Sequence, residues 1–258
     1  MILLDTPYPG VAQLTVNRPQ VRNALDWETM DAFADAVTEL AGRSDVRALV
    51  VCGAHGTFLS GGDLRALHDA TGEAAGARLV AGMTRSLERL AALPYPVFAA
   101  LDGAARGGGA EVALACDVRV MAQDATLGFV QVRLGLMPGW GGAQRLLRLV
   151  GYGRALLWLT TGEVLDAAQA YAAGLVEALA PTGGALPAAL ELARQVAAQS
   201  PQAVQAIKRT LRAHLDGVSP AWSAALEQAA FPPLWAHPYH QQAVKRFLQR
   251  KEGNDDAV

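Results

Sequence analysis

Three consecutive glycines, with a glutamate two residues after the last of them, form the segment of this sequence most suited to catalysis. Gly107, Gly108 and Gly109 come after an apolar run, and Glu111 falls in the first turn of the helix that they are predicted to open. Glycines let a substrate approach the backbone closely, and the unpaired N–H groups of a helix start can hold an oxyanion. The carboxylate of Glu111 can then exchange protons with the polarised group. The same glycines also suit a turn that only lets a helix pack closely on a sheet.

A second glycine turn, in the sequence SGGD, has the same setting. The apolar run 48–53 predicts a buried strand, and Gly61 and Gly62 follow it before Asp63, a predicted helix N-cap. Two such turns in one sheet favour ligand binding more than either does alone. A dinucleotide fingerprint fits poorly, because Val112 stands where its third glycine belongs, and the sequence contains no GxxxxGK[ST].

Other residues with chemical potential carry weaker signals. Trp140 lies among glycines and has room to line an apolar pocket, although a place in the hydrophobic core explains it equally well. The five histidines lack the HExxH spacing of a zinc site, and no metal ligation is expected. Ser60 lacks the GxSxG context of a serine hydrolase nucleophile.

The elements that must position these residues alternate between strands and helices. Apolar runs predict strands at residues 11–16, 48–53, 97–101, 118–121, 126–128 and 175–179. Helical spacing follows Asp26, spans 73–90 and begins again at Gly108. Beyond the segment 181–187, every predicted element is helical. We therefore expect an α/β core over residues 1–184 and a helical region over 185–258 that packs elsewhere, such as on a neighbouring subunit.

The composition of this 258-residue chain limits the classes of partner that it is expected to bind. A net charge of −2 and 18% charged residues give no electrostatic footprint for nucleic acid or an anionic membrane. The start of the chain lacks signal-peptide features, and no apolar run is long enough to span a bilayer. Cys52 and Cys116 are too few for a disulfide framework and are typical of small buried residues. We expect a soluble cytoplasmic protein that binds a small molecule or copies of itself.

Four segments, taken in order, resemble motifs of the crotonase family of enoyl-CoA hydratases and isomerases. They read NRPQVRNAL, GTFLSGGDL, PVFAALDGAARGGGAEVALACD and GLMPGWGGAQRL, and the similarity covers nearly the whole chain. The resemblance implies an α/β fold, a spiral of ββα units followed by a C-terminal α-helical region for trimerisation. It also implies a homotrimer or a hexamer built as a dimer of trimers, and a place in fatty acid metabolism.

The resemblance also implies roles for particular residues. The backbone N–H groups of Gly62 and Gly108 fall on the family's oxyanion hole for the thioester oxygen. Glu111 falls on the first of the two glutamates that hydratases use, whereas the position of the second holds Gln131. Trp140, a predicted substrate-binding residue, would supply the apolar wall that strips water from a leaving carboxylate in the decarboxylating members of the family.

The ligand that the resemblance implies is an acyl-CoA thioester. The backbone of Arg22, Ala24 and Leu25 falls on the loop that contacts the adenine and pantetheine parts of coenzyme A. Coenzyme A enters as part of the substrate, and no metal or other cofactor is implied.

Gln131 leaves several activities open. Hydration of a 2-enoyl-CoA is the leading hypothesis, although it is best served by two carboxylates, and glutamine can orient a water without exchanging a proton. The segment around Gln131 is also similar to family members that decarboxylate ethylmalonyl- or methylmalonyl-CoA, which need only one proton donor. The hypothesis that the protein isomerises a 3-enoyl-CoA is weakened, because in isomerases of the family the position of Gln131 often holds the catalytic base. The alternative from outside the enzymes is a non-catalytic subunit that binds acyl-CoA.

Overall fold

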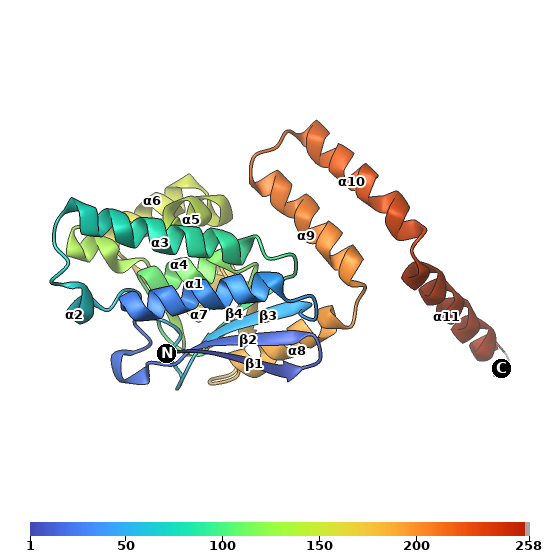
Figure 1. Ribbon diagram of the computed structural model, residues 1–258, viewed down its shortest axis with the longest axis horizontal. Helices are drawn as coiled ribbons and strands as arrows, with labels where there is room; N and C mark the ends of the chain where they lie inside the picture. The colour runs from blue at the N-terminus through green and yellow to red at the C-terminus, as the bar shows by residue number, and fades with distance from the viewer. Residues whose placement is uncertain (256–258) are drawn as a thin grey trace. The chain divides into compact units, whose positions relative to one another are not determined.

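The computed structural model describes the backbone of residues 1–255 and the side chains of residues 1–249. The chain divides into two compact units, the first spanning Met1–Ala197 and the second beginning at Ala198 (Figure 1). Residues 256–258, the end of the predicted helical region, lie outside the described residues.

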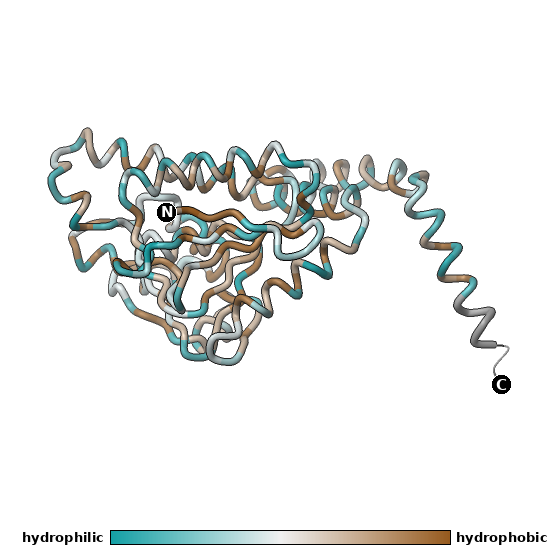
Figure 2. The backbone as a smooth tube through the Cα atoms, turned by 60° about the horizontal axis from the view of Figure 1, so that its bottom comes forward, coloured by the Kyte–Doolittle hydropathy of each residue, from teal (hydrophilic) through white to brown (hydrophobic). Residues whose placement is uncertain are grey.

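The first unit is built on a six-stranded sheet with the strand order β1-β2-β3-β4-β6-β9. Its strands are β1 (Ile2–Tyr8), β2 (Val11–Val16), β3 (Ala48–Gly53), β4 (Val97–Leu101), β6 (Val118–Ala122) and β9 (Ala178–Ala180). β1 and β2 form an antiparallel pair, and the remaining neighbours are parallel. Hydrophobic residues run along these strands in Figure 2, because the central strands are buried on both faces.

Helices cover this sheet and are anchored by side-chain caps. α1 (Trp27–Gly42) begins at Asp26, whose carboxylate accepts a hydrogen bond from the Thr29 N–H, and it packs against α3 (Glu73–Ala91). α8 (Ala185–Ala197) begins where Asp102 accepts hydrogen bonds from two N–H groups of its first turn. α8 contacts β3, β4 and β6, so the first unit extends to residue 197 instead of ending at the predicted boundary after 184.

A smaller sheet, in the order β5-β7-β8, carries the elements next to the glycine turns. Its strands are β5 (Ala105–Arg106), β7 (Thr126–Gly128) and β8 (Val164–Asp166). The other elements of this unit are η1 (Pro19–Val21), α2 (Leu64–Leu67), α4 (Gly108–Ala115), η2 (Val130–Leu134), α5 (Gly142–Val150), α6 (Tyr152–Thr161) and α7 (Ala167–Ala172). From β4 to β9 the chain passes back and forth between the two sheets, which agrees with the expected spiral.

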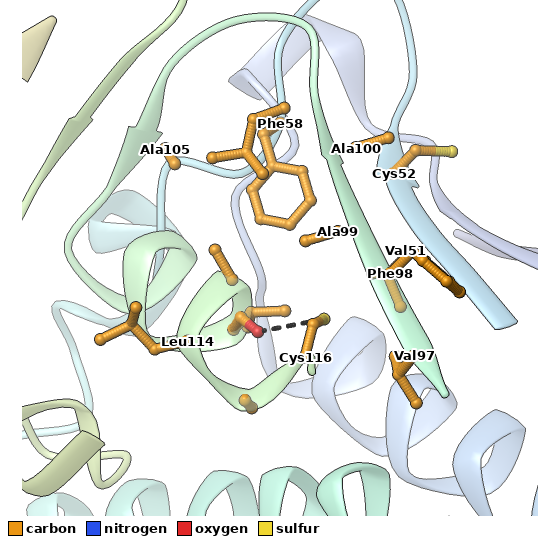
Figure 3. Close-up of a cluster of buried hydrophobic side chains, with 14 of the residues drawn as sticks. Val51, Cys52, Phe58, Val97, Phe98, Ala99, Ala100, Ala105, Leu114 and Cys116 are labelled. Atoms are coloured by element: carbon orange, nitrogen blue, oxygen red, sulfur yellow. Dashed lines mark hydrogen bonds between the residues drawn. The ribbon is translucent and has the colours of Figure 1, made fainter. Parts of the chain in front are cut away.

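One part of the hydrophobic core lies between β3, β4 and α4 (Figure 3). Phe58 fills the space among small residues such as Ala99 and Ala105, and all eight residues of α4 are buried. Cys52 and Cys116 are free and buried in this core, as predicted. Glu111 is the one charged residue of this otherwise apolar helix, and a buried carboxylate in such a setting is unusual.

The second unit consists of α9 (Pro201–Leu215), α10 (Pro220–Trp235) and α11 (Pro238–Asp255). Ser200 and Ser219 cap α9 and α10, and each is followed by a proline at the first helical position, as their sequences require. Large apolar side chains of α10 stay exposed in this single chain, among them Trp222, Phe231 and Trp235. None of the described helices is long and apolar enough to cross a lipid bilayer.

Candidate active site

The two glycine turns lie side by side. Leu59 forms an isolated parallel bridge with Ala105, and the Leu59 carbonyl accepts a hydrogen bond of 2.9 Å from the Arg106 N–H. Gly61, at a φ of +90°, packs so closely that a Cβ there would lie 2.9 Å from the Gly108 nitrogen. The tertiary structure therefore brings together the two segments that sequence analysis singled out separately.

Both segments present backbone N–H groups without acceptors. Gly107 has a φ of +53° and donates its own N–H to the Gly128 carbonyl, which turns the chain into α4 with Gly108 as the first helical residue. Within the described part of the chain, the N–H groups of Gly62 and Gly108 donate to no acceptor. Two free donors on adjacent turns can stabilise the negative charge that develops on a thioester oxygen.

Glu111 is the carboxylate of this site, and it is only 1% exposed. Its Oε2 accepts hydrogen bonds of 2.7 Å from the backbone N–H groups of Trp140 and Gly142. Its Oε1 accepts longer hydrogen bonds, 2.9 Å from Gln131 Nε2 and 3.3 Å from the Gly139 N–H. Oε2 is therefore the anchored oxygen, and Oε1 is the oxygen that is freer to exchange a proton.

Burial and hydrogen bonding act on the charge of Glu111 in opposite directions. Desolvation raises the pKa of the carboxyl, and the hydrogen bonds from Gly142, Trp140 and Gln131 oppose that rise. The net effect is a raised pKa, which moves the group towards the range in which a carboxyl both accepts and returns a proton.

Gln131, at the second glutamate position of the resemblance, lies on η2, and its side chain donates a hydrogen bond directly to Glu111. Because an ionised carboxylate only accepts hydrogen bonds, the Gln131 amide must turn its Nε2 towards Glu111. Its Oε1 is consequently left buried without a donor among the described residues. An unsatisfied buried acceptor beside a carboxylate is costly and calls for a ligand that donates a hydrogen bond.

Trp140 lies against the start of α4 and is 4% exposed. A Cβ at Gly108 would come within 2.1 Å of the indole Cζ3, so glycine is required for this contact. The indole thus packs in the core beside Gly108, as one of the two interpretations of the sequence expects, and its role as a wall of an acyl pocket stays a prediction.

The loop 22–25, predicted to contact coenzyme A, is joined to the SGGD turn. Leu25 donates its N–H to the Gly61 carbonyl, and the Leu25 carbonyl accepts the Asp63 N–H, both at 2.8 Å. Arg22 is exposed, whereas Ala24 and Leu25 are buried and therefore offer mainly their backbone to a ligand.

Residues 6–254 match the protein family described as Enoyl-CoA hydratase/isomerase. The chain belongs to this family. Ethylmalonyl-CoA decarboxylase of Gallus gallus is 34% identical over 95% of this chain and 83% of its own length. Short-chain-enoyl-CoA hydratase of Clostridium acetobutylicum is 32% identical over 94% of this chain and 92% of its own length. 2,3-Dehydroadipyl-CoA hydratase of Escherichia coli is 35% identical over 93% of each chain.

Solved structures confirm the fold expected for the enoyl-CoA hydratase/isomerase family. Enoyl-CoA hydratase from Bacillus anthracis superimposes with a TM-score of 0.92 at 30% identity, covering 96% of each chain. An enoyl-CoA hydratase from Polaromonas sp. JS666 gives a TM-score of 0.90 at 29% identity, covering 96% of this chain and 97% of that one. The family assignment and the crotonase-type α/β spiral are therefore established, whereas the roles of individual residues stay predictions.

Two residues that support the loop 22–25 and the SGGD turn were missed by sequence analysis. Asn23 is fully buried at a φ of +56°, and its Nδ2 donates hydrogen bonds to the carbonyls of Ala54 and Thr57. Arg18 forms ion pairs with Asp26 and Asp63. The tolerance of asparagine for positive φ was the one local signal for Asn23, and no local signal exists for the ion pairs of Arg18.

The histidines and acidic residues form no metal site in the described part of the chain. His68 follows the SGGD turn, but its side chain is exposed and pairs with Asp69.

Proposed function

We propose that this protein adds water to the double bond of a 2-enoyl-CoA, and removes it in the reverse direction, with Glu111 as the proton-exchanging group. The observation that carries the proposal is the pair of acceptors formed by Glu111 Oε1 and the unsatisfied Gln131 Oε1. The proposal is supported by relatives named short-chain-enoyl-CoA hydratase and 2,3-dehydroadipyl-CoA hydratase.

A water molecule suits this pair of acceptors. It has two hydrogens to donate, one to the carboxylate of Glu111 and one to Gln131 Oε1, which orients an oxygen lone pair towards the substrate. The carboxylate accepts one of these protons as base, and the amide only fixes the direction of the other O–H bond. Gln131 thereby replaces the orienting role of a second carboxylate, but not its acidity.

The proton balance closes with a single carboxylate. As the water oxygen bonds to C3 of the enoyl group, Glu111 takes a proton from the water, and the electrons of the double bond pass into a thioester enolate. The N–H groups of Gly62 and Gly108 stabilise the enolate oxygen, each contributing on the order of 10² to 10³ in rate. Glu111 then returns its proton to C2, so the net change is the addition of one water.

Decarboxylation of an alkylmalonyl-CoA is the second candidate. It is supported by the relative named ethylmalonyl-CoA decarboxylase, by the lack of a carboxylate at Gln131 and by the apolar face of Trp140. The negative charge of Glu111 and the buried, unsatisfied Oε1 of Gln131 weigh against it, because both repel a substrate carboxylate placed beside them. A neutral hydrogen-bond donor is the better occupant.

A parallel turnover assay tests the choice. Crotonyl-CoA and ethylmalonyl-CoA are supplied separately, and loss of the enoyl absorbance and release of CO₂ are followed. We expect hydration without decarboxylation, and a loss of about 10²-fold in Gln131→Leu, because the water loses its orienting acceptor. Release of CO₂ without hydration would favour the second candidate. Tight binding of both thioesters with no turnover would favour a non-catalytic acyl-CoA-binding subunit.

The pH dependence of hydration provides a separate test of Glu111. Only the ionised carboxylate can take a proton from water, so kcat/KM for crotonyl-CoA falls as the pH falls through the pKa of Glu111. Because burial raises that pKa, the fall sets in at a higher pH than for an ordinary glutamate. An acid limb centred at the ordinary glutamate pKa of about 4.3 would contradict the assignment.

The wider expectations stay proposals. Coenzyme A is carried in with the substrate, and the backbone of Arg22, Ala24 and Leu25 is proposed to contact its adenine and pantetheine parts, which is supported by the bonds that join this loop to the SGGD turn. Assembly into a homotrimer or hexamer is supported by the exposed Trp222 and Phe231, which are costly to leave in water. A cytoplasmic location and a place in fatty acid metabolism remain predictions from the sequence.

A further inference from the structure

Arg18 lies at the centre of a charged cluster beside the SGGD turn. Its Nη2 is 2.6 Å from Asp26 Oδ2, and its Nη1 is 3.1 Å from Asp63 Oδ2. Nη1 also donates a hydrogen bond to the Ala24 carbonyl. The side chains of Arg18, Asp26 and Asp63 are 15%, 22% and 9% exposed, so solvent screens these contacts only in part.

Asp63 connects this cluster to the oxyanion site. It directly follows Gly62, and the Leu25 backbone bonds to Gly61 on one side of Gly62 and to Asp63 on the other. The free N–H of Gly62 is therefore directed by a short segment that is held at both ends, while the Arg18–Asp63 ion pair fixes the side chain at its end.

Arginine is the side chain that fits this position. Its planar guanidinium presents several N–H groups in fixed directions, so one group can engage two carboxylates and a carbonyl together. Without it, the carboxylates of Asp26 and Asp63 face each other without a cation among the contacts described, and their repulsion separates the loop from the turn.

We infer that Arg18 is a positioning residue for the oxyanion hole, which sets the direction of the Gly62 N–H and couples it to the loop 22–25. The inference rests on the proposed oxyanion role of Gly62, but not on which reaction follows. A misplacement of about 1 Å in such a site costs on the order of 10²-fold in rate, so the effect of Arg18 on turnover is expected to be large.

The test measures polarisation of the thioester carbonyl, which needs no turnover. Butyryl-CoA labelled with ¹³C at the carbonyl is bound to the full-length protein, and the carbonyl stretch is recorded by infrared difference spectroscopy. The wild-type protein is expected to lower this frequency relative to free butyryl-CoA. In Arg18→Met, most of that shift is lost from the bound ligand, and kcat for crotonyl-CoA falls by about 10- to 100-fold.

Three variants separate positioning from general stability. Asp63→Asn keeps the Oδ1 that caps α2 but replaces the Oδ2 that contacts Arg18. This variant should therefore lose much of the frequency shift, as Arg18→Met does. Arg18→Lys should retain only part of the frequency shift, because an ammonium group reproduces only some of the contacts that the planar guanidinium makes. Arg43→Met breaks the exposed Arg43–Asp45 pair and should leave both frequency and turnover unchanged.

The outcomes are distinguishable. A full wild-type frequency shift in folded Arg18→Met would overturn the inference, even if its melting temperature falls. A wild-type protein that polarises butyryl-CoA but does not hydrate crotonyl-CoA would contradict the proposed reaction, while loss of the shift in Arg18→Met would still support the inference.

Discussion

Replacement of Glu111 by glutamine is expected to lower hydration of crotonyl-CoA by at least about 10² to 10⁴, with the fold and acyl-CoA binding retained. The amide has the shape of the carboxylate but cannot exchange a proton. Its oxygen can still accept hydrogen bonds from Trp140 and Gly142, and its NH₂ can donate to Gln131 once that side chain turns over. The Gly139 N–H, 3.3 Å from Glu111 Oε1, loses its acceptor in this variant, but the two shorter bonds to Oε2 are kept while the chemistry is removed.

The measurement is kcat with crotonyl-CoA together with the Kd for butyryl-CoA and the melting temperature. Glu111→Ala is the contrasting variant, because it leaves the N–H groups of Trp140 and Gly142 buried without an acceptor. Each such group costs about 1–3 kcal/mol, so this variant should lose stability as well as turnover. Full turnover in Glu111→Gln would refute the assignment of Glu111 as the proton-exchanging group.

Gly108→Ala is expected to lower kcat by about 10² to 10³ and the free energy of unfolding by about 1–3 kcal/mol. The added methyl would lie 2.1 Å from Trp140 Cζ3 and 2.5 Å from its Cη2, so either the indole or the start of α4 must move. Movement of the helix start displaces the Gly108 N–H that we propose as an oxyanion donor. Movement of the indole disturbs the backbone that donates to Glu111.

Gly82→Ala is the matched control for this substitution. Gly82 lies within α3, and a Cβ there meets open space. Alanine should raise helix stability by about 0.5–1 kcal/mol and leave turnover unchanged. Both variants are compared by chemical denaturation and by kcat with crotonyl-CoA. A wild-type kcat in Gly108→Ala would contradict the assignment of Gly108 to the oxyanion hole.

Local sequence patterns predicted most of the secondary structure. The strands 11–16, 48–53, 97–101 and 126–128 have the predicted bounds, and Asp26 and Asp63 cap helices as expected. These features depend on neighbours in sequence, namely apolar runs, turn glycines and a side chain that reaches its own helix start. The α/β class followed from their alternation.

The errors occurred where a distant residue intervened. The apolar run 175–179 predicted a strand, but β9 is Ala178–Ala180. The Leu175 carbonyl is bound by Arg119 Nε instead of a neighbouring strand. The boundary after residue 184 also differs from the structure, because α8 finds its N-cap in Asp102 and its packing surface on the main sheet.

The sequence by itself determined the chemical groups of the site, because glycine turns and a glutamate at a helix start are local features. Only the tertiary structure decided how they combine. The bond between Glu111 and Gln131, the unsatisfied Oε1 of Gln131 and the pairing of Arg18 with Asp63 join residues from separate elements. Such contacts depend on which strands pair and where helices pack, and those long-range choices are made by burial of the whole core.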